Sequence, residues 1–194
     1  MKQATILAVF IALITFSFAL PANANYRSTV KHSADTSLMK ISTIQSMLQE
    51  IINATGLHSS FELKEANVLN IEASISHRKR YILYNPAYIT SLTKISKSKW
   101  AVMALLAHEV GHHLNGHTIR KGGSTPALEL EADEFAGFIL HKLGATLAQS
   151  QNVMYYIAKA KESKTHPSKN SRLLAIEKGW NKASALQEMT AAKR

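Results

Sequence analysis

The chain has 194 residues and a formal charge of +10, because 23 lysines and arginines outnumber 13 aspartates and glutamates. Hydrophobic residues make up 46% of the chain and charged residues 19%, which excludes a disordered basic tail, since such a chain buries enough apolar surface to offset its conformational entropy. There is no cysteine, which excludes disulfide frameworks, cysteine nucleophiles and thiolate metal sites. Any metal ion would therefore be bound by nitrogen and oxygen atoms.

Residues 1–24 have the pattern of a secretory signal peptide. Lys2 gives a positive start, residues 6–20 are apolar and uncharged, and residues 21–24 end in the small residues that signal peptidase requires. An uncleaved membrane anchor is the alternative, but the apolar run is shorter than the roughly 20 residues that span a bilayer. The sequence therefore predicts an exported protein, periplasmic or secreted. Its remaining part, residues 25–194, is predicted to be a single domain without a transmembrane segment.

The region after residue 24 alternates helical and extended patterns, which predicts a mostly helical α+β domain. Apolar residues at helical spacing predict a helix over residues 36–55, and Gly56 suits the left-handed conformation that ends it. A second, short helix is expected to lead from Pro86 into residues 94–99. The serines and lysines of that basic segment are typical of a solvated surface.

Three short extended segments between these helices predict a small sheet. Residues 61–66, 68–76 and 80–85 contain β-branched residues or alternate in polarity, as strands do. Residues 77–79, between the second and third segments, resemble a hairpin turn. We therefore expect a small antiparallel sheet.

The residues with the clearest chemistry are His108-Glu109-Val110-Gly111-His112, within a helix expected over residues 99–115. Residues four apart lie one above the other on a helix, so the rings of His108 and His112 can reach a single ion. Glu109 is turned toward the open side, where a water molecule would lie. Apolar residues on the opposite face are expected to pack inward. The motif also occurs by chance, so the surrounding sequence has to decide its meaning.

That context is an acidic segment, residues 129–134, which holds four of the 13 acidic residues of the chain. A catalytic zinc ion takes three protein ligands and keeps one position open, and without cysteine the third ligand is a carboxylate or another histidine. A helix capped by Thr125 would place Glu129 and Asp133 on one face. We assign Glu129 as the third ligand and Asp133 as the acceptor of a hydrogen bond from a ligating histidine, while Glu131 points elsewhere. The alternative is a solvated acidic helix face.

Because further histidines follow the motif, a second zinc-binding arrangement, the metzincin pattern, has to be considered. That pattern requires a histidine six residues after His112, where Thr118 stands, so His117 misses the position by one residue. His113 and His117 are therefore expected to be exposed or hydrogen-bonded to protein groups and not to bind the metal. The same interpretation holds for the remaining isolated histidines, which are His32, His58, His77 and His141.

The order of these motifs resembles the gluzincin metallopeptidases of the HtpX and CAAX-prenyl-protease type. The resemblance rests on three segments: His108-Glu-x-x-His112, Glu129-x-x-Ala132-Asp133, and Thr165-His166-Pro167 with Arg172 behind it. Residues 70–73 also resemble the edge strand that lines the substrate cleft in that family. The integral-membrane branches have several spanning helices and a long insert before the third ligand, which this sequence lacks. The membrane-linked substrates of those relatives are therefore not expected here.

The resemblance implies a zincin-like metallopeptidase fold, with the small sheet beside the helix that carries the histidine motif, and one bound zinc ion. The implied ligands are His108, His112 and Glu129, and Glu109 is the implied general base. His166 and Arg172 would approach the metal and steady the transition state. For these last two residues a purely positional role is an equal alternative, because a histidine before proline is often a loop residue and an arginine can cover the start of a helix.

The sequence therefore predicts a zinc-dependent endopeptidase that hydrolyses peptide bonds of protein substrates in the cell envelope or outside the cell. An extended peptide or an unfolded protein segment would pair with a strand such as residues 68–76, unless that strand is internal. The alternative function is an exported cationic binding module, or an inactive protease-like scaffold, with a structural metal and weak attraction to anionic surfaces. Nucleic acid is not expected as a partner, because the basic residues are scattered and have no aromatic residues between them.

Overall fold

The structure is a computed structural model that describes residues 40–58, 61–119 and 123–193. The predicted signal peptide, residues 1–24, and the first residues of the first predicted helix lie outside the described residues. Within the described part, no helix combines the length and the apolar character needed to cross a membrane.

The described residues confirm an α+β architecture, mostly helical with one small sheet. Helix α1 ends, as predicted, at a left-handed Gly56 with φ 75°, but it begins later than predicted. The elements in chain order are α1 (Ile41–Thr55), β1 (Phe61–Glu65), β2 (Ile71–Ser76), β3 (Lys79–Tyr84), α2 (Pro86–Ser96), α3 (Lys99–Leu114), the 3-10 helix η1 (His117–Ile119), α4 (Pro126–Lys142), α5 (Leu147–Gln151), α6 (Met154–Ile157) and α7 (Lys169–Ala191).

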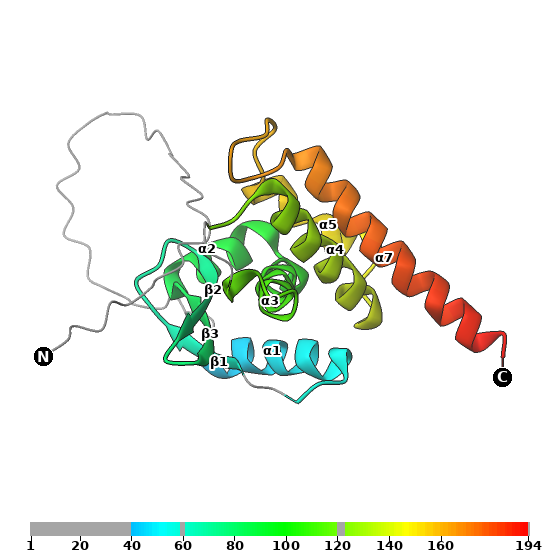
Figure 1. Ribbon diagram of the computed structural model, residues 1–194, viewed down its shortest axis with the longest axis horizontal. Coiled ribbons are helices and arrows are strands. Elements are labelled where there is room, and N and C mark those ends of the chain that lie inside the picture. The colour runs from blue at the N-terminus through cyan, green and yellow to red at the C-terminus, as the bar shows by residue number, and fades with distance from the viewer. Residues whose placement is uncertain (1–39, 59–60, 120–122, 194) are drawn as a thin grey trace, which may run out of the picture.

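Helix α3 is the central element of the fold. Figure 1 shows it nearly end-on, with the sheet on one side, α1 below it and α4 and α7 on the other side. The side-chain oxygen of Ser98 caps its start by accepting a hydrogen bond from the Trp100 amide. Every residue from 101 to 113 is buried, so α3 is covered on all sides and not on one apolar face as the sequence pattern suggested. The histidine motif therefore lies inside the molecule.

The sheet has three strands in the order β1-β3-β2, and the prediction of an antiparallel sheet is wrong for one of its two pairings. Strands β2 and β3 form the expected antiparallel hairpin, whose two turn residues, His77 and Arg78, have φ of 49° and 64°. Strand β1 instead pairs in parallel with β3. After β1 the chain crosses to the far edge of the sheet, where it forms β2. Strand β3 then returns between the two and occupies the centre.

Asn85 holds this crossing in place. Its backbone amide donates to the carbonyl of Asn70 at 2.8 Å, and its side-chain amide donates to the carbonyl of Val68 at 2.9 Å. Its side-chain oxygen accepts hydrogen bonds from the first amides of α2, where Pro86 occupies the first position. One residue thus ends β3, fixes the segment before β2 and starts α2.

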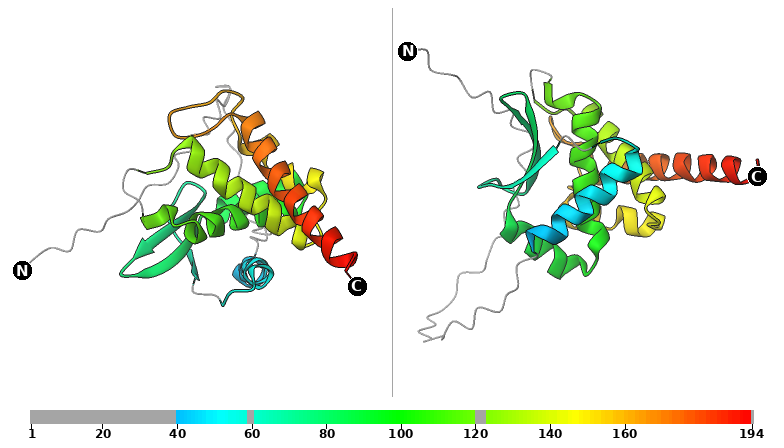
Figure 2. Two further views of the ribbon diagram at one scale, coloured as in Figure 1. Left: turned by 45° about the vertical axis from the view of Figure 1, so that its right-hand side comes forward. Right: turned by 90° about the horizontal axis from the view of Figure 1, so that it is seen from below.

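Helices α4 and α7 pack at very short distance through two glycines. A Cβ atom on Gly137 of α4 would collide with the backbone carbonyl of Ile176, and one on Gly179 of α7 would collide with the carbonyl of Glu134. In the left view of Figure 2, α7 runs along α4, and in both views its C-terminal part extends beyond the other elements. This close contact matters because α4 and α7 both supply side chains to the site described below.

We predict that Gly179→Ala destabilises the protein by about 3 kcal/mol or more, because a backbone collision forces the two helices apart. In an open helix the same change would stabilise by about 1 kcal/mol. Asn181→Ala, at an exposed position two residues later, is the control and should leave stability within about 0.5 kcal/mol of the parent. Urea unfolding followed by circular dichroism measures both, and equal stability of the two variants would contradict the packing argument.

Candidate metal centre

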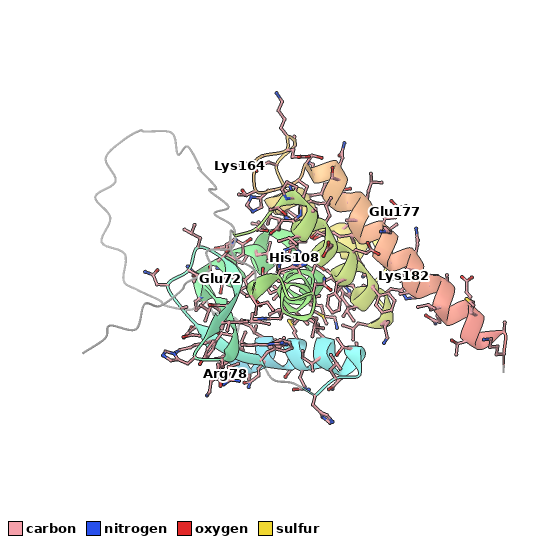
Figure 3. The ribbon with its side chains drawn as sticks, viewed as in Figure 1. Glu72, Arg78, His108, Lys164, Glu177 and Lys182 are labelled. Atoms are coloured by element: carbon pink, nitrogen blue, oxygen red, sulfur yellow. The ribbon has the colours of Figure 1, made fainter. Side chains whose placement is uncertain are left out.

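Two helices bring three metal-binding side chains together. Helix α3 supplies His108 and His112, one turn apart, and α4 supplies Glu129 from its first turn. The helices come close because Gly111 has no side chain: a Cβ atom there would lie 3.3 Å from the Cα of Ala132. Figure 3 shows His108 at the centre of the molecule, away from labelled surface residues such as Lys164 and Lys182.

The two ring nitrogens and the two carboxylate oxygens of Glu129, one facing each ring, lie at distances close to those in a tetrahedral metal site. Nε2 of His108 lies 3.0 Å from Nε2 of His112 and 3.3 Å from Oε2 of Glu129, and Nε2 of His112 lies 3.5 Å from Oε1 of Glu129. Zinc bonds of about 2.0–2.2 Å at tetrahedral angles place donors about 3.3–3.6 Å apart. All three residues are buried, and together they could hold one metal ion.

The charges around this point favour a cation. Burial lowers the pKa of His108, but the carboxylates of Asp133 and Glu129 outweigh this effect and raise the pKa to about 10. Burial and the nearby charge on His108 lower the pKa of His112 to about 3. Burial opposes ionisation of Glu129, yet its contact with His108 holds the pKa of that carboxyl well below its usual range. The positive charge that Asp133 and Glu129 favour on His108 therefore lies at the donor cluster, where a bound cation would also be favoured.

Asp133 supports His108 from the side away from the donor cluster. Its Oδ1 accepts a hydrogen bond from Nδ1 of His108 at 2.9 Å, the position expected from the helical spacing. Arg172, at the start of α7, donates from Nε to Oδ2 and from its terminal nitrogen to Oδ1 of Asp133, both at 2.7 Å. Burial raises the pKa of Asp133, but the guanidinium of Arg172 outweighs it and lowers that pKa. Arg172 is thus occupied with Asp133, and its guanidinium lies 4.0 Å from Glu129.

Glu109 lies in contact with the sheet. Its Oε2 accepts a hydrogen bond from the backbone amide of Ala73 at 2.7 Å. Because Ala73 pairs with Ile82 on the other side of β2, this amide belongs to the free edge of that strand. Burial raises the pKa of Glu109 to about 8, and the neighbouring charge of His108 opposes the rise. The expected general base therefore stands between the donor cluster and the edge of the sheet.

His166 lies in the segment between α6 and α7, next to a pocket of about 210 Å³. The pocket is also lined by Arg172, which connects it to the donor cluster, and by Lys159 and Lys161. Thr165 contacts Nδ1 of His166 at 2.8 Å, whereas the buried Nε2 has no hydrogen-bond partner among the described residues. Burial lowers the pKa of His166. The ring is therefore expected to be neutral at pH 7.

Three residues contact the site in ways that the sequence did not predict. The hydroxyl of Ser124, just before α4, donates a hydrogen bond to Oε1 of Glu129. His117 contacts Nδ1 of His112, and Glu131 contacts His117 in turn. The alternating acids at 129, 131 and 133 could have indicated that Glu131 also lies near the site. The sequence interpretation placed Glu131 away from the metal and did not identify His117 as its partner. His117 does not contribute to the donor cluster, as expected.

His113 connects α3 to neighbouring elements and does not belong to the donor cluster. It is buried, and its Nε2 donates to the carbonyl of Tyr81 at 2.9 Å while Nδ1 accepts from the Thr118 hydroxyl at 3.3 Å. Burial lowers its pKa to about 4. His113 thus joins the end of α3 to β3 and η1 as a neutral ring.

Comparisons with protein-family models, with curated proteins and with solved structures found no match for this chain.

We predict that Glu129→Ala lowers zinc affinity by more than about 100-fold, which exceeds the 10–100-fold loss typical of residues that only support a ligand. Glu134→Ala is the matched control, because Glu134 lies on the same helix but pairs with Lys178 at the surface. The zinc affinity of this variant should stay within twofold of that of the parent. Competition with a chromophoric chelator measures both variants. Equal affinities would show that α4 supplies no ligand.

Arg172→Met should destabilise the metal-free protein by about 3–5 kcal/mol, because it leaves the buried Asp133 carboxylate without its cation. Adding Asp133→Asn removes that charge, so the double variant should be more stable than Arg172→Met alone. Lys178→Met, which breaks an exposed pair, should cost less than about 1 kcal/mol. Urea unfolding in the presence of a chelator tests the series, and a double variant less stable than the single one would refute the ion-pair argument.

Proposed function

We propose that this protein is an exported zinc-dependent endopeptidase of the gluzincin type, with a zincin-like arrangement of α3, α4 and the sheet. The observation that carries the proposal is the buried His108, His112 and Glu129 cluster, whose donor spacing fits one tetrahedral ion, with Glu109 beside it. Export rests on the signal-like pattern of residues 1–24.

The donor set favours zinc. Two imidazole nitrogens and one carboxylate oxygen are a ligand combination of catalytic zinc sites, which keep the fourth position for water or substrate. Calcium and magnesium prefer all-oxygen sites, which this cluster is not. When bound, the ion would supply an acidified water and polarise a peptide carbonyl.

Glu109 is the residue we assign as general base. It follows His108 directly on α3, and its carboxylate is held by the Ala73 amide on the side of the sheet. Burial alone favours its protonated form, so a divalent cation nearby would favour the ionised form that accepts a proton. Glu109 would take a proton from the attacking water and return it to the leaving amine.

The free edge of β2 is the surface we assign to the substrate. Among the described residues no strand pairs with its outward amides and carbonyls, and the amide of Ala73 marks where this edge passes Glu109. An extended peptide that pairs with the edge would bring its backbone alongside the donor cluster. Backbone pairing reads side chains weakly, which suits unfolded or flexible protein segments.

His166 and Arg172 receive different functions in this proposal. Nε2 of His166 is buried and has no hydrogen-bond partner within the described part of the chain, so it can donate a hydrogen bond to the oxyanion of the transition state when it carries the proton. Arg172 has its guanidinium bound to Asp133, and we assign it the positioning of Asp133 and, through it, of His108.

Glu109→Gln should abolish cleavage of an unfolded substrate such as casein, by at least about 10³-fold, while the protein still binds one zinc ion, because the amide cannot accept the proton. Glu177→Gln, on the part of α7 labelled in Figure 3, is the control and should cleave at the parent rate. Metal analysis and a fluorescent casein assay provide the two readouts.

Unchanged proteolysis in the Glu109→Gln variant would overturn the mechanism. Zinc binding without cleavage of any member of a broad peptide panel would favour the binding module with a structural metal.

A further inference from the structure

The far side of the His112 ring is connected to the protein surface by two side chains. Nδ1 of His112 lies 2.9 Å from Nδ1 of His117, and Nε2 of His117 lies 2.9 Å from Oε2 of Glu131. The two rings meet nearly edge to face, with centroids 5.0 Å apart and an angle of 71° between their planes. His112 and His117 are buried, whereas the side chain of Glu131 is 54% exposed.

Metal binding gives this chain of hydrogen bonds a single direction. A histidine that binds a metal through Nε2 carries its proton on Nδ1, so His112 has to donate to Nδ1 of His117. The proton of a neutral His117 is then on Nε2, from where it donates to the carboxylate of Glu131. Each of the three groups therefore determines the tautomer of the next.

The backbone holds the pair in place. Gly116 has φ 72°, a left-handed conformation that returns the chain after α3 and places η1 against it. Within η1, Thr118 is buried and its hydroxyl contacts His113 of α3 at 3.3 Å, which fixes the neighbouring His117. Glu131 comes from α4, two residues after the ligand Glu129, and reaches His117 from the other side.

This arrangement parallels the support of the other histidine ligand. Nδ1 of His108 donates to Asp133, which is bound by Arg172, and Nδ1 of His112 faces His117, which is bound by Glu131. Both ligands thus have an acceptor on Nδ1 that is itself held by a charged group. Because His112 is fully buried, removal of His117 would leave its Nδ1 proton without a replacement from bulk water.

We infer that His117 and Glu131 are positioning residues for the metal site, which fix the tautomer and orientation of His112 so that its Nε2 faces the ion. This inference rests on the metal site of the proposed function. The competing explanation is a hydrogen bond that only stabilises the turn between α3 and η1, and it would change folding stability without changing the metal site.

The test uses the full chain and two metals, Zn²⁺ for affinity and Co²⁺ for its visible absorption spectrum. His117→Phe keeps an aromatic ring but removes the acceptor, and we expect a 10–100-fold loss of zinc affinity and an altered Co²⁺ spectrum at saturation. His117→Asn places its side-chain oxygen near the position of Nδ1, so affinity should return to within a few fold of the parent. Glu131→Ala should lose about tenfold, and Glu131→Gln, which keeps an acceptor oxygen, less.

His141→Phe is the matched control. This histidine lies near the other end of α4, where its ring contacts Trp180 with centroids 4.5 Å apart, so its loss should leave both metal readouts unchanged. Circular dichroism shows whether each variant is folded. If His117→Phe does not fold, the Glu131→Ala variant decides, because its side chain is half-exposed and its removal leaves no cavity in the core.

The outcomes separate the two proposals. A parent protein that binds no Zn²⁺ would overturn the proposed function and this inference with it. A parent that binds Zn²⁺, together with folded His117→Phe or Glu131→Ala variants of unchanged affinity and Co²⁺ spectrum, would overturn the inference alone. Loss of affinity in His117→Phe with recovery in His117→Asn would support it.

Discussion

His108 and His112 on α3 and Glu129 on α4 direct their donor atoms toward one buried point. Two imidazoles and a carboxylate are costly to bury unless a cation lies between them, and their donor atoms meet only if α3 and α4 approach closely. The missing side chain of Gly111 permits that approach. Contacts through Gly137 and Gly179 then hold α4 against α7, so the packing of three helices serves the geometry of one site.

The charges inside the molecule nearly balance, and this balance explains why α7 belongs to the site. Burial opposes ionisation of Glu129 and Asp133, but the charges of His108 and of the Arg172 guanidinium outweigh it and lower both pKa values. Without α7, the Asp133 carboxylate would lose the guanidinium of Arg172, and His108 would lose the fixed acceptor of its Nδ1 proton. Arg172, which is 64 residues after His108 in the sequence, therefore helps to orient this ligand through Asp133 without belonging to the donor cluster itself.

The sequence predicted those features that depend on local spacing. The helical repeat placed His108 above His112 and Asp133 one turn after Glu129, and the structure has the same arrangement. Contacts that depend on a backbone turn were not predictable in this way. His117 reaches His112 only because Gly116 adopts φ 72°, and Glu131 finds its partner on that returning segment. The full burial of α3 also follows from its central position in the fold, which its own residue pattern does not reveal.

The observed strand order, which differs from the expected antiparallel sheet, affects which strand edge lies beside the proposed site. In an antiparallel meander of β1, β2 and β3, the middle strand is β2, and both of its edges would be paired. The observed order places β3 in the middle and leaves one edge of β2, beside α3, unpaired within the part of the chain that the structure describes. Only with that order can the Ala73 amide point away from β3 and donate to Glu109. The parallel pairing of β1 with β3 is therefore what makes a strand edge available next to the residue that we assign as general base.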